Sequence, residues 1–311
     1  MKKVLVTGAA GFIGSHLCEA LLAKNIDVTG IDCFTEYYPR EIKEKNLSAF
    51  KENPKFHFME ANLLNYDLKR IVPEVDTVFH LAAQPGVRYS WENIQVYIDN
   101  NVFATQKLLE ACKESKPQFV FASSSSVYGD AKELPITEKT ELSPISPYGE
   151  TKVKGEELCQ MYAQEQKLPM IVLRYFTVYG PRQRPDMAIY KFFNSIIDGK
   201  EVEIFGDGNQ TRDMTYVSDI VDATLLAGDF DIDYSVFNIA SGVRSSLKDV
   251  IKNIETLAKN KAKINYKPAA KGDMKDTWAS IEKARTQLKY EPKVRLEEGL
   301  GKYLEWHTQN K

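Results

Sequence analysis

The sequence predicts an α/β fold, in which parallel strands form one sheet with helices on both faces, and three observations lead to it. Short apolar runs alternate with longer amphipathic runs along most of the chain. A glycine-rich turn, Gly8 to Gly14, separates the first apolar run from the first amphipathic one. The chain has 311 residues, more than one small core needs. Together these observations indicate repeated βαβ units with a smaller lobe appended.

The alternation assigns each element in turn. The predicted buried strands are Val4–Thr7, Val28–Asp32, Phe56–Met59, Val75–Leu81, Phe119–Ser123, Met170–Tyr175 and Val236–Ala240. The predicted helices are Ile13–Leu22, Asn101–Ser115, Tyr148–Glu165 and Ser218–Leu226. Strands that alternate with helices in this way imply a parallel sheet, here of about seven strands.

The regular pattern ends near Thr177, which places a domain boundary there. Turn residues occupy 181–185 and 206–208, and the tail from Leu247 to Trp306 is charged and helical in period. We therefore expect a sheet domain over residues 1–176, to which 217–240 return. Residues 177–216 and 241–311 are expected to form a smaller mixed α/β substrate lobe.

The composition is that of an ordinary folded protein and excludes several kinds of partner. Hydrophobic residues make up 43% of the chain and charged residues 27%. The net charge of −2 favours neither nucleic acid nor an anionic membrane as a partner. The four scattered cysteines form no Cys-x-x-Cys pair, so we expect a cytoplasmic protein without a disulfide frame or a metal site. The chain reaches Gly8 at once, and no apolar run approaches the roughly 20 residues of a membrane span, so we expect neither a signal peptide nor an anchor.

The turn after the first predicted strand has the glycine spacing of a dinucleotide-binding site. Gly8 allows the tight turn, Gly11 lets phosphates approach the backbone, and Gly14 lets the helix pack closely on the strand. The helix N-terminus at Phe12 and Ile13 offers free N–H groups to a pyrophosphate. The glycine pattern alone is weak evidence, so its weight depends on the residues at the end of the second predicted strand.

An acidic residue stands where such a turn requires one. Asp32 ends the second predicted strand, 18 residues after Gly14. A carboxylate there accepts hydrogen bonds from an adenosine ribose and repels a 2′-phosphate, which favours NAD over NADP. A strand-terminal turn residue is the alternative interpretation of Asp32. Lys43 is placed to reach the same ribose or a phosphate, or to be an ordinary solvated helix lysine.

Small residues follow the fourth predicted strand and would let a cofactor lie over the strand ends. The cofactor-contacting residues predicted here are Leu81, Ala82, Ala83 and Gln84. His80, just before them, is expected to be structural, because no serine–aspartate constellation accompanies it.

Tyr148 and Lys152 are four residues apart and share one face of a predicted helix. A free tyrosine has a pKa of about 10, so a tyrosine that acts as a base near neutrality needs a pKa lower by roughly 3. A lysine ammonium beneath the phenol would stabilise the phenolate. The pair therefore predicts proton and hydride transfer at a carbinol carbon, although its spacing is short and common.

Taken together, these motifs resemble the extended short-chain dehydrogenase/reductases that act on nucleotide sugars. The matching segments are Gly8–Gly14, His80–Ala83, Asn100–Val102, Ser123–Gly129 and the Tyr148/Lys152 pair. The resemblance runs from Lys3 to about Tyr303. It implies a doubly wound Rossmann domain, a C-terminal lobe for a nucleotide sugar, tightly held NAD and a homodimer.

The resemblance also assigns further residues to the cofactor. These are Asn62, Leu63, Asn101, Ser123 and Tyr175. Asn62 departs from the pattern, because many relatives have an aspartate there that faces the adenine amine. One adenine contact is therefore less secure, while the rest of the site is unaffected.

Three serines after the fifth predicted strand bear on the reaction type. Ser124 matches the hydroxyl that hydrogen-bonds the substrate O4 in this family, and Ser125 and Ser126 are expected near the sugar. Dehydratases and uronate decarboxylases of the family carry Asp or Glu at one or both of the latter positions. Serine cannot do that acid–base work, so the sequence argues against 4,6-dehydration and favours epimerisation.

Four segments resemble the UDP-glucuronate 4-epimerases within this family: residues 86–90, 176–180, 184–188 and, more loosely, 34–38. Thr177 stands where UDP-glucose 4-epimerases usually have asparagine. Arg184 is a planar cation suited to the sugar carboxylate, or a loop arginine that pairs with Asp186. Arg88 is expected to meet the diphosphate or to be exposed.

The nucleotide end is assigned by resemblance alone. Arg212 matches the family's arginine on the diphosphate, and Lys271 and Asp273 lie where the family binds the nucleotide. The expected function is a NAD-dependent UDP-glucuronate 4-epimerase that interconverts UDP-glucuronate and UDP-galacturonate. The alternatives are a 4-epimerase for UDP-glucose or UDP-N-acetylglucosamine, a UDP-glucuronate decarboxylase, and a non-enzymatic NAD-binding regulator.

Overall fold

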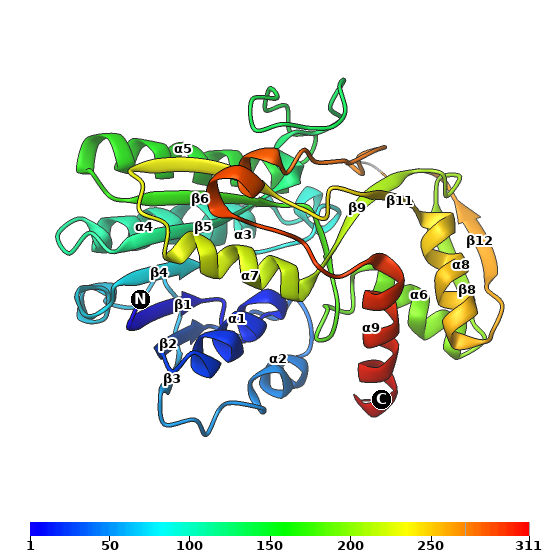
Figure 1. Ribbon diagram of the computed structural model, residues 1–311, viewed down its shortest axis with the longest axis horizontal. Helices are drawn as coiled ribbons and strands as arrows, with labels where there is room; N and C mark the ends of the chain where they lie inside the picture. Colours follow the sequence, from blue (N-terminus) through cyan, green and yellow to red (C-terminus); the bar gives the residue numbers. More distant parts are fainter. Residues whose placement is uncertain (271, 311) are drawn as a thin grey trace.

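The computed structural model describes residues 1–270 and 272–310 and has a large sheet domain beside a smaller lobe (Figure 1). The large domain contains one sheet in the order β10-β6-β5-β4-β1-β2-β3, and every pair in it is parallel. Its strands are β1 (Lys3–Thr7), β2 (Asp27–Asp32), β3 (Phe56–Glu60), β4 (Thr77–His80), β5 (Gln118–Ser124), β6 (Met170–Tyr175) and β10 (Tyr234–Ile239). The seven predicted strands are therefore confirmed, each within two residues at either end.

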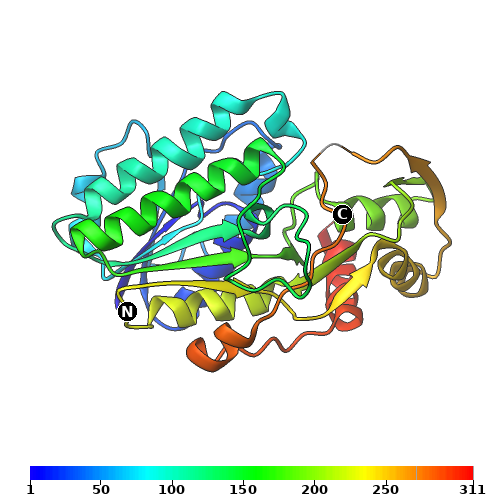
Figure 2. The same cartoon turned by 90° about the horizontal axis from the view of Figure 1, so that it is seen from above.

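Helices cover both faces of this sheet (Figure 2). The α-helices are α1 (Phe12–Ala23), α2 (Arg40–Leu47), α3 (Ile94–Tyr97), α4 (Ala104–Cys112), α5 (Pro147–Gln166), α6 (Ala188–Ile197), α7 (Val217–Gly228), α8 (Leu247–Ala258) and α9 (Leu296–Asn310). Short 3-10 helices occupy Leu68–Arg70, Val72–Glu74, Tyr89–Trp91 and Ser125–Val127. Among the described residues, no helix is both long enough and apolar enough to cross a membrane.

The strands are apolar throughout because each face of the sheet has its own core. Along β1, Val4 and Val6 belong to the cluster beneath α1 and α7, whereas Leu5 belongs to the cluster beneath α4 and α5. A strand buried on both faces cannot alternate with polar residues, which explains the continuous apolar runs of the sequence. The α1/α7 cluster continues into the lobe through residues such as Phe193 and Tyr303.

The predicted helix Asn101–Ser115 is part of a longer helical run that already begins at Ile94. The helical run begins with α3, passes through a π-helical stretch at Ile98–Phe103, and continues as α4. Within that stretch, the Asn101 side chain accepts from Gln84 N at 2.7 Å and donates to Gln84 O at 3.1 Å. Sequence periodicity does not show this, since a side chain that bonds another loop alters the helical repeat through a tertiary contact.

The smaller lobe is built from two small sheets and the helices α6, α8 and α9. One sheet contains β7 (Thr177–Tyr179), β9 (Thr211–Tyr216) and β11 (Arg244–Ser246), and the other pairs β8 (Glu201–Phe205) with β12 (Lys263–Lys267) in parallel. The prediction of a helical tail is right for α8 and α9 and wrong between them. The β12 segment depends on β8 for its backbone partners, so its own composition, rich in lysine, did not indicate a strand.

Candidate active site

Two hollows meet at the carboxyl ends of the sheet strands, where ligands bind in open α/β sheets. The first has a volume of about 200 Å³ and runs from the glycine turn to Tyr148 and Lys152. Predicted cofactor residues that line it are Gly8, Gly11, Phe12, Ile13, Gly14, Asp32, Lys43, Asn62, Leu63, Leu81, Ala82, Ala83, Ser123, Tyr148, Lys152 and Tyr175. Gln84 and Asn101 bond each other behind its wall and are almost fully buried.

The second hollow, of about 830 Å³, lies toward the lobe. It is lined by the predicted substrate residues Arg88, Thr177, Arg212 and Asp273. Tyr37 lines both hollows, and it therefore marks the place where they adjoin. Lys271 lies outside the described residues.

The glycine turn is shaped to hold a diphosphate. Gly8 has a φ of 73°, and a Cβ on Gly14 would lie 2.1 Å from Gly8 O, so the helix passes too close for a side chain. Helix α1 begins after Gly11, which makes no side-chain cap. The N–H groups of the first turn are thus left for an acceptor, as a pyrophosphate requires.

Asp32 lies beside this turn with both carboxylate oxygens partly engaged. It accepts from Phe34 N at 2.9 Å and from Ala10 N at 3.2 Å, which leaves lone pairs for ribose hydroxyls. Burial raises the pKa of Asp32, and the ammonium of Lys43 and the backbone donors oppose that rise. The glycine turn and Asp32 together fit the phosphate and ribose of a dinucleotide.

Lys43 is not the solvated lysine that the sequence allowed. It is almost fully buried, and its ammonium donates to Thr35 O at 2.9 Å and to Thr35 Oγ1 at 3.2 Å. The ammonium also lies 4.8 Å from the centroid of the Tyr38 ring. Lys43 therefore holds the loop after β2 in addition to facing Asp32.

His80 has the structural role expected of it. Its Nδ1 bonds Thr7 Oγ1 at 2.7 Å and its Nε2 bonds Thr105 Oγ1 at 2.9 Å. Burial, with a contribution from Lys152, lowers the pKa of His80 to about 3, so the ring is neutral. It joins β1 and β4 to the helix above them.

Helix α5 brings Tyr148 to the site in its first turn. Ser146 caps the helix by accepting from Gly149 N at 3.1 Å, and Pro147 occupies the first helical position. A Cβ on Gly149 would lie 2.6 Å from Ser126 O, so the helix start packs directly against the serine run. This close approach places the Tyr148 phenol next to Ser124.

The electrostatics of Tyr148 differ from the sequence-based expectation. The pKa of the Tyr148 phenol is raised above its usual value, because burial outweighs a hydrogen bond with Ser124 and the charge of Arg184, which both act to lower it. Lys152, which was expected to supply that charge, instead lies with its ammonium 4.7 Å from the centroid of the Phe121 ring. Arg184 is thus the cation that acts on the phenol here, and a contribution of Lys152 with the cofactor bound stays a prediction.

Lys152 is itself strongly perturbed. Burial lowers the pKa of Lys152 to about 8, and the neighbouring Cys159 and Glu156 oppose that shift. Lys152 remains on the Tyr148 face of α5 and lines the cofactor hollow. It is therefore placed to contact a cofactor beside the phenol.

The serine run ends β5 and turns away in a 3-10 helix. Ser124 accepts from Ser126 N at 3.2 Å and donates to Ser126 Oγ at the same distance. Ser125 and Ser126 are buried but line neither hollow. Of the three serines, Ser124 is the one that reaches Tyr148.

Arg184 has one of the two roles that the sequence left open, because it pairs with Asp186, and its contact with a sugar carboxylate stays a prediction. It lines the cofactor hollow, and its charge reaches Tyr148. It also forms a forked ion pair with Asp186, Nε to Oδ1 at 2.9 Å and Nη2 to Oδ2 at 3.1 Å. Tyr37 donates its hydroxyl to the same carboxylate at 3.1 Å.

Arg88 and Arg212, which were expected near the diphosphate, are fixed in place by contacts with residues of the smaller lobe. Arg88 pairs with Asp273 at 2.8 Å and stacks 3.8 Å from the centroid of the Phe205 ring. Arg212 donates to the backbone carbonyls of Thr211, Met274 and Lys275. These contacts position both cations at the wall of the larger hollow.

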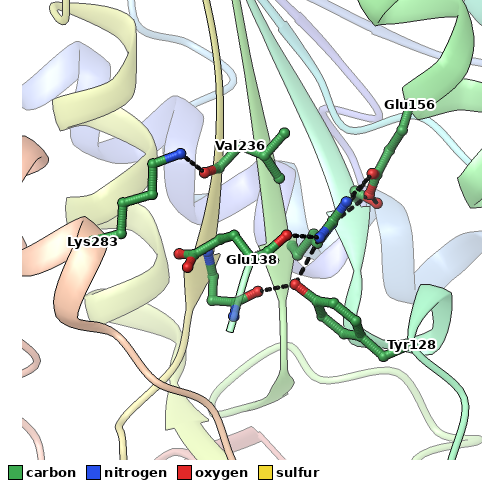
Figure 3. Close-up of polar contacts among 8 residues, drawn as sticks. Tyr128, Glu138, Glu156, Val236 and Lys283 are labelled. Atoms are coloured by element: carbon green, nitrogen blue, oxygen red, sulfur yellow. Dashed lines mark hydrogen bonds and ion pairs between the residues drawn. The ribbon is translucent and has the colours of Figure 1, made fainter. Parts of the chain in front are cut away.

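A buried polar network braces helix α5, and sequence analysis missed it (Figure 3). Glu156 of α5 accepts from Ser123 Oγ at 2.5 Å and from Arg174 Nη2 at 2.6 Å. Arg174 also donates to the Tyr128 hydroxyl at 2.7 Å, and Tyr128 donates to Asn238 Oδ1 at 2.6 Å. The spacing of Glu156, four residues after Lys152, was the available signal, whereas Arg174 lay hidden in an apolar strand.

No group of three or more His, Cys, Asp or Glu residues in the described part of the chain is arranged to hold a metal ion. The cofactor hollow is lined by a phenol, a buried ammonium and a guanidinium, and the Ser124 hydroxyl contacts the phenol without lining the hollow itself.

Comparisons with known proteins identify a matching family, similar sequences and a similar crystal structure. The NAD dependent epimerase/dehydratase family matches residues 4–240. An uncharacterized UDP-glucose epimerase of Bacillus subtilis, YtcB, is 47% identical over 96% of this chain and 95% of its own length. A UDP-glucuronate 4-epimerase of Thermodesulfobacterium geofontis is 39% identical over 98% of this chain and 96% of its own. A crystal structure of UDP-glucuronic acid 4-epimerase from Bacillus cereus, in complex with UDP-glucuronic acid and NAD, has a TM-score of 0.96 at 43% identity and covers 99% of this chain and 100% of that one.

Proposed function

The chain belongs to the NAD-dependent epimerase/dehydratase family, and we propose on that basis that it is a UDP-glucuronate 4-epimerase. One observation carries the proposal: Tyr148, Lys152 and Arg184 line the same dinucleotide hollow, and Ser124 contacts the Tyr148 phenol. A base and a carboxylate-binding cation within one site match a uronate whose C4 hydroxyl must lose its proton.

NAD is the cofactor that these residues fit. The glycine turn would hold its diphosphate, Asp32 its adenosine ribose, and Lys152 its nicotinamide ribose. When bound, NAD supplies the redox chemistry, taking a hydride from the sugar carbon and returning it to the opposite face.

The residues of the chain control the proton and the position of the sugar. Tyr148 removes the O4 proton and later returns it, while Ser124 orients O4. The 4-keto form of a uronate is a β-keto acid, so the site must also prevent loss of carbon dioxide. Arg184 serves this purpose by fixing the plane of the carboxylate, together with neighbouring hydroxyls such as that of Thr177.

A second function is favoured by a specific observation. Arg184 is already paired with Asp186 in the structure, so an uncharged sugar does not leave the guanidinium without a partner. Together with the similarity to YtcB, this supports a 4-epimerase for neutral UDP-hexoses as the second candidate.

The function is tested by incubating the purified protein separately with UDP-glucuronate, UDP-glucose and UDP-N-acetylglucosamine, without added cofactor. The expected result is formation of UDP-galacturonate from UDP-glucuronate, with nicotinamide nucleotide released when the protein is denatured. No net redox change occurs, so external NAD should not be consumed. Conversion of the neutral sugars alone would establish the second candidate, and carbon dioxide release would indicate a decarboxylase.

Arg184→Ala tests the carboxylate contact. Loss of a charge-assisted hydrogen bond, roughly 1.5–3 kcal/mol, should lower kcat/KM for UDP-glucuronate by about one to two decades. Activity on UDP-glucose should fall less, and a loosened carboxylate should allow some pentose product. Measurements of kcat/KM on both substrates and of the product spectrum check this.

The matched control for that experiment is Arg182→Ala. Arg182 lies in the same loop, pairs with Glu19 and lines neither hollow. Equal proportional losses on charged and neutral sugars in Arg184→Ala would show that Arg184 supports the loop or the diphosphate and does not bind the sugar carboxylate.

We also propose that the protein works as a cytoplasmic homodimer. Large apolar side chains are exposed on the α3–α4 run and on α5, namely Ile94, Val96, Phe103 and Met161. The four cysteines are unpaired, which suits a reducing compartment. Sedimentation of the wild type and of Phe103→Glu tests the interface, because a buried charge there should shift the protein towards monomer.

A further inference from the structure

In the structure, Arg184 is already paired with a carboxylate of the protein itself, that of Asp186. Both oxygens of Asp186 engage it, through Nε and Nη2, in the planar fork that is typical of strong arginine–carboxylate pairs. The side chains are 19% and 32% exposed, so the pair is largely removed from water. The Nη1 group of Arg184 makes no contact with Asp186 in this fork, which leaves it for a second acceptor.

Both members of the pair carry their charges at neutral pH. Burial acts to raise the pKa of Asp186, but Arg184 and the Tyr37 hydroxyl outweigh it and hold that pKa below its usual range. Burial likewise opposes the charge on Arg184, whereas Asp186 stabilises it and the net pKa is raised. Asp186 is thus a genuine counter-ion.

Tyr37 fixes this counter-ion at the junction of the two hollows. Its ring lies 5.2 Å from that of Tyr89, centroid to centroid. A Cβ on Gly86 would lie 2.2 Å from its hydroxyl oxygen, so the glycine at that position makes room for the phenol. The loop after β2 resembled the UDP-glucuronate 4-epimerases in sequence, but no role for it was evident from the sequence. In the structure, Tyr37 of this loop contacts Asp186, which lies 149 positions later in the chain.

A counter-ion changes how the site discriminates between sugars. A site with an unpaired buried arginine rejects an uncharged sugar strongly, because binding that sugar leaves the charge without a partner. With Asp186 present, Arg184 keeps its partner when the sugar has no carboxylate. A uronate, by contrast, must share the guanidinium with Asp186 and lie near a second negative charge.

We propose that Asp186, held by Tyr37, is a specificity-determining residue. It weakens the preference of the site for uronates over neutral UDP-hexoses and so lets neutral UDP-hexoses bind. The inference rests on the proposed epimerase function, and it assigns to Asp186 an effect opposite to that of Arg184. Removal of Arg184 should weaken selection for the carboxylate, whereas removal of the Asp186 charge should strengthen it.

The test is Asp186→Asn, which keeps the size of the side chain and an oxygen for Arg184 and Tyr37. The ratio of kcat/KM for UDP-glucuronate to that for UDP-glucose should rise roughly tenfold, as expected when one charged competitor for a hydrogen bond is removed. Asp186→Glu restores the charge, and its ratio should lie closer to the wild type. Thermal melts show that each variant is folded.

The matched control is Asp222→Asn. Asp222 pairs with Lys293 on the protein surface and lines neither hollow, so this variant makes the same change in net charge away from the site. Its ratio should equal that of the wild type. A ratio in Asp186→Asn that is unchanged or falls would overturn the proposal and leave Asp186 as a residue that only holds the loop.

Binding measurements separate this inference from the proposed function. The affinities of UDP-glucuronate and UDP-glucose are measured by calorimetry in a Tyr148→Phe background, where turnover is suppressed, with and without Asp186→Asn. If the wild type fails to epimerise either sugar, the proposed function is wrong, whatever the affinities are. If the wild type epimerises and Asp186→Asn leaves the affinity ratio unchanged, the counter-ion inference alone is wrong.

Discussion

Replacement of Tyr148 by phenylalanine is expected to slow epimerisation by roughly 10²–10⁴-fold, the usual range for loss of a general base. The ring of Tyr148 packs at the start of α5, with its centroid 6.1 Å from that of Tyr97, and phenylalanine preserves that packing. The hydroxyl that contacts Ser124 is the group removed. Binding of NAD and of the UDP-sugar should therefore be largely retained.

Single-turnover kinetics and the nicotinamide content of the purified variant check this result. Tyr162→Phe is the matched control, because Tyr162 lies on the same helix and bonds Glu110, away from the site. The control should epimerise at the wild-type rate. Near-normal turnover in Tyr148→Phe would show that Tyr148 is not the base, and another group would then have to take the O4 proton.

The second large effect is expected on stability. Arg174→Met leaves the Glu156 carboxylate buried without its cation, and breaking a buried pair in this way costs about 3–5 kcal/mol of unfolding free energy. The lost contacts join α5 to β6 and extend to Tyr128 (Figure 3). Unfolding in denaturant, followed by circular dichroism, measures the loss.

The design of that experiment includes two comparisons. Arg70→Met removes an exposed arginine that pairs with Asp67 and should leave the unfolding midpoint almost unchanged. Arg174→Met combined with Glu156→Gln should recover part of the loss, because no uncompensated charge stays buried. If Arg174→Met proves no more harmful than Arg70→Met, the network does not brace the catalytic helix.

The charge near Tyr148 has a consequence for how the base is activated. Burial alone makes the phenol a poorer acid, and in the structure the opposing contributions come from Ser124 and Arg184. In the structure Arg184 acts on the phenol and pairs with Asp186, and under the proposed function it would also bind the sugar carboxylate. We therefore expect substitutions in the loop from 184 to 186 to change both the rate and the selectivity.

Local patterns determined most of the sheet domain. The seven strands follow from apolar runs, because both faces of the sheet are buried and each strand must be apolar throughout. Gly8 and Gly14 are required where the backbone turns and where helix meets strand, and steric limits of this kind act over a few residues. Tyr148 and Lys152 share a helix, so their spacing alone placed them on one face.

Only the tertiary structure decided how distant side chains pair. Tyr37 meets Asp186 across 149 positions, and Glu156 meets Arg174 across the gap between α5 and β6. The partner of β12 is likewise a strand about sixty positions earlier in the chain. Sequence periodicity records which way a side chain faces on its own helix or strand and carries no information about which residue of another element it will meet. The glycine turn and the Tyr148–Lys152 pair were therefore predictable, and Asp186 was one of the partners that the sequence offered for Arg184. The contact of Tyr37 with Asp186 and the charge acting on Tyr148 depended on how the loops after β2 and β7 close over the ends of the sheet.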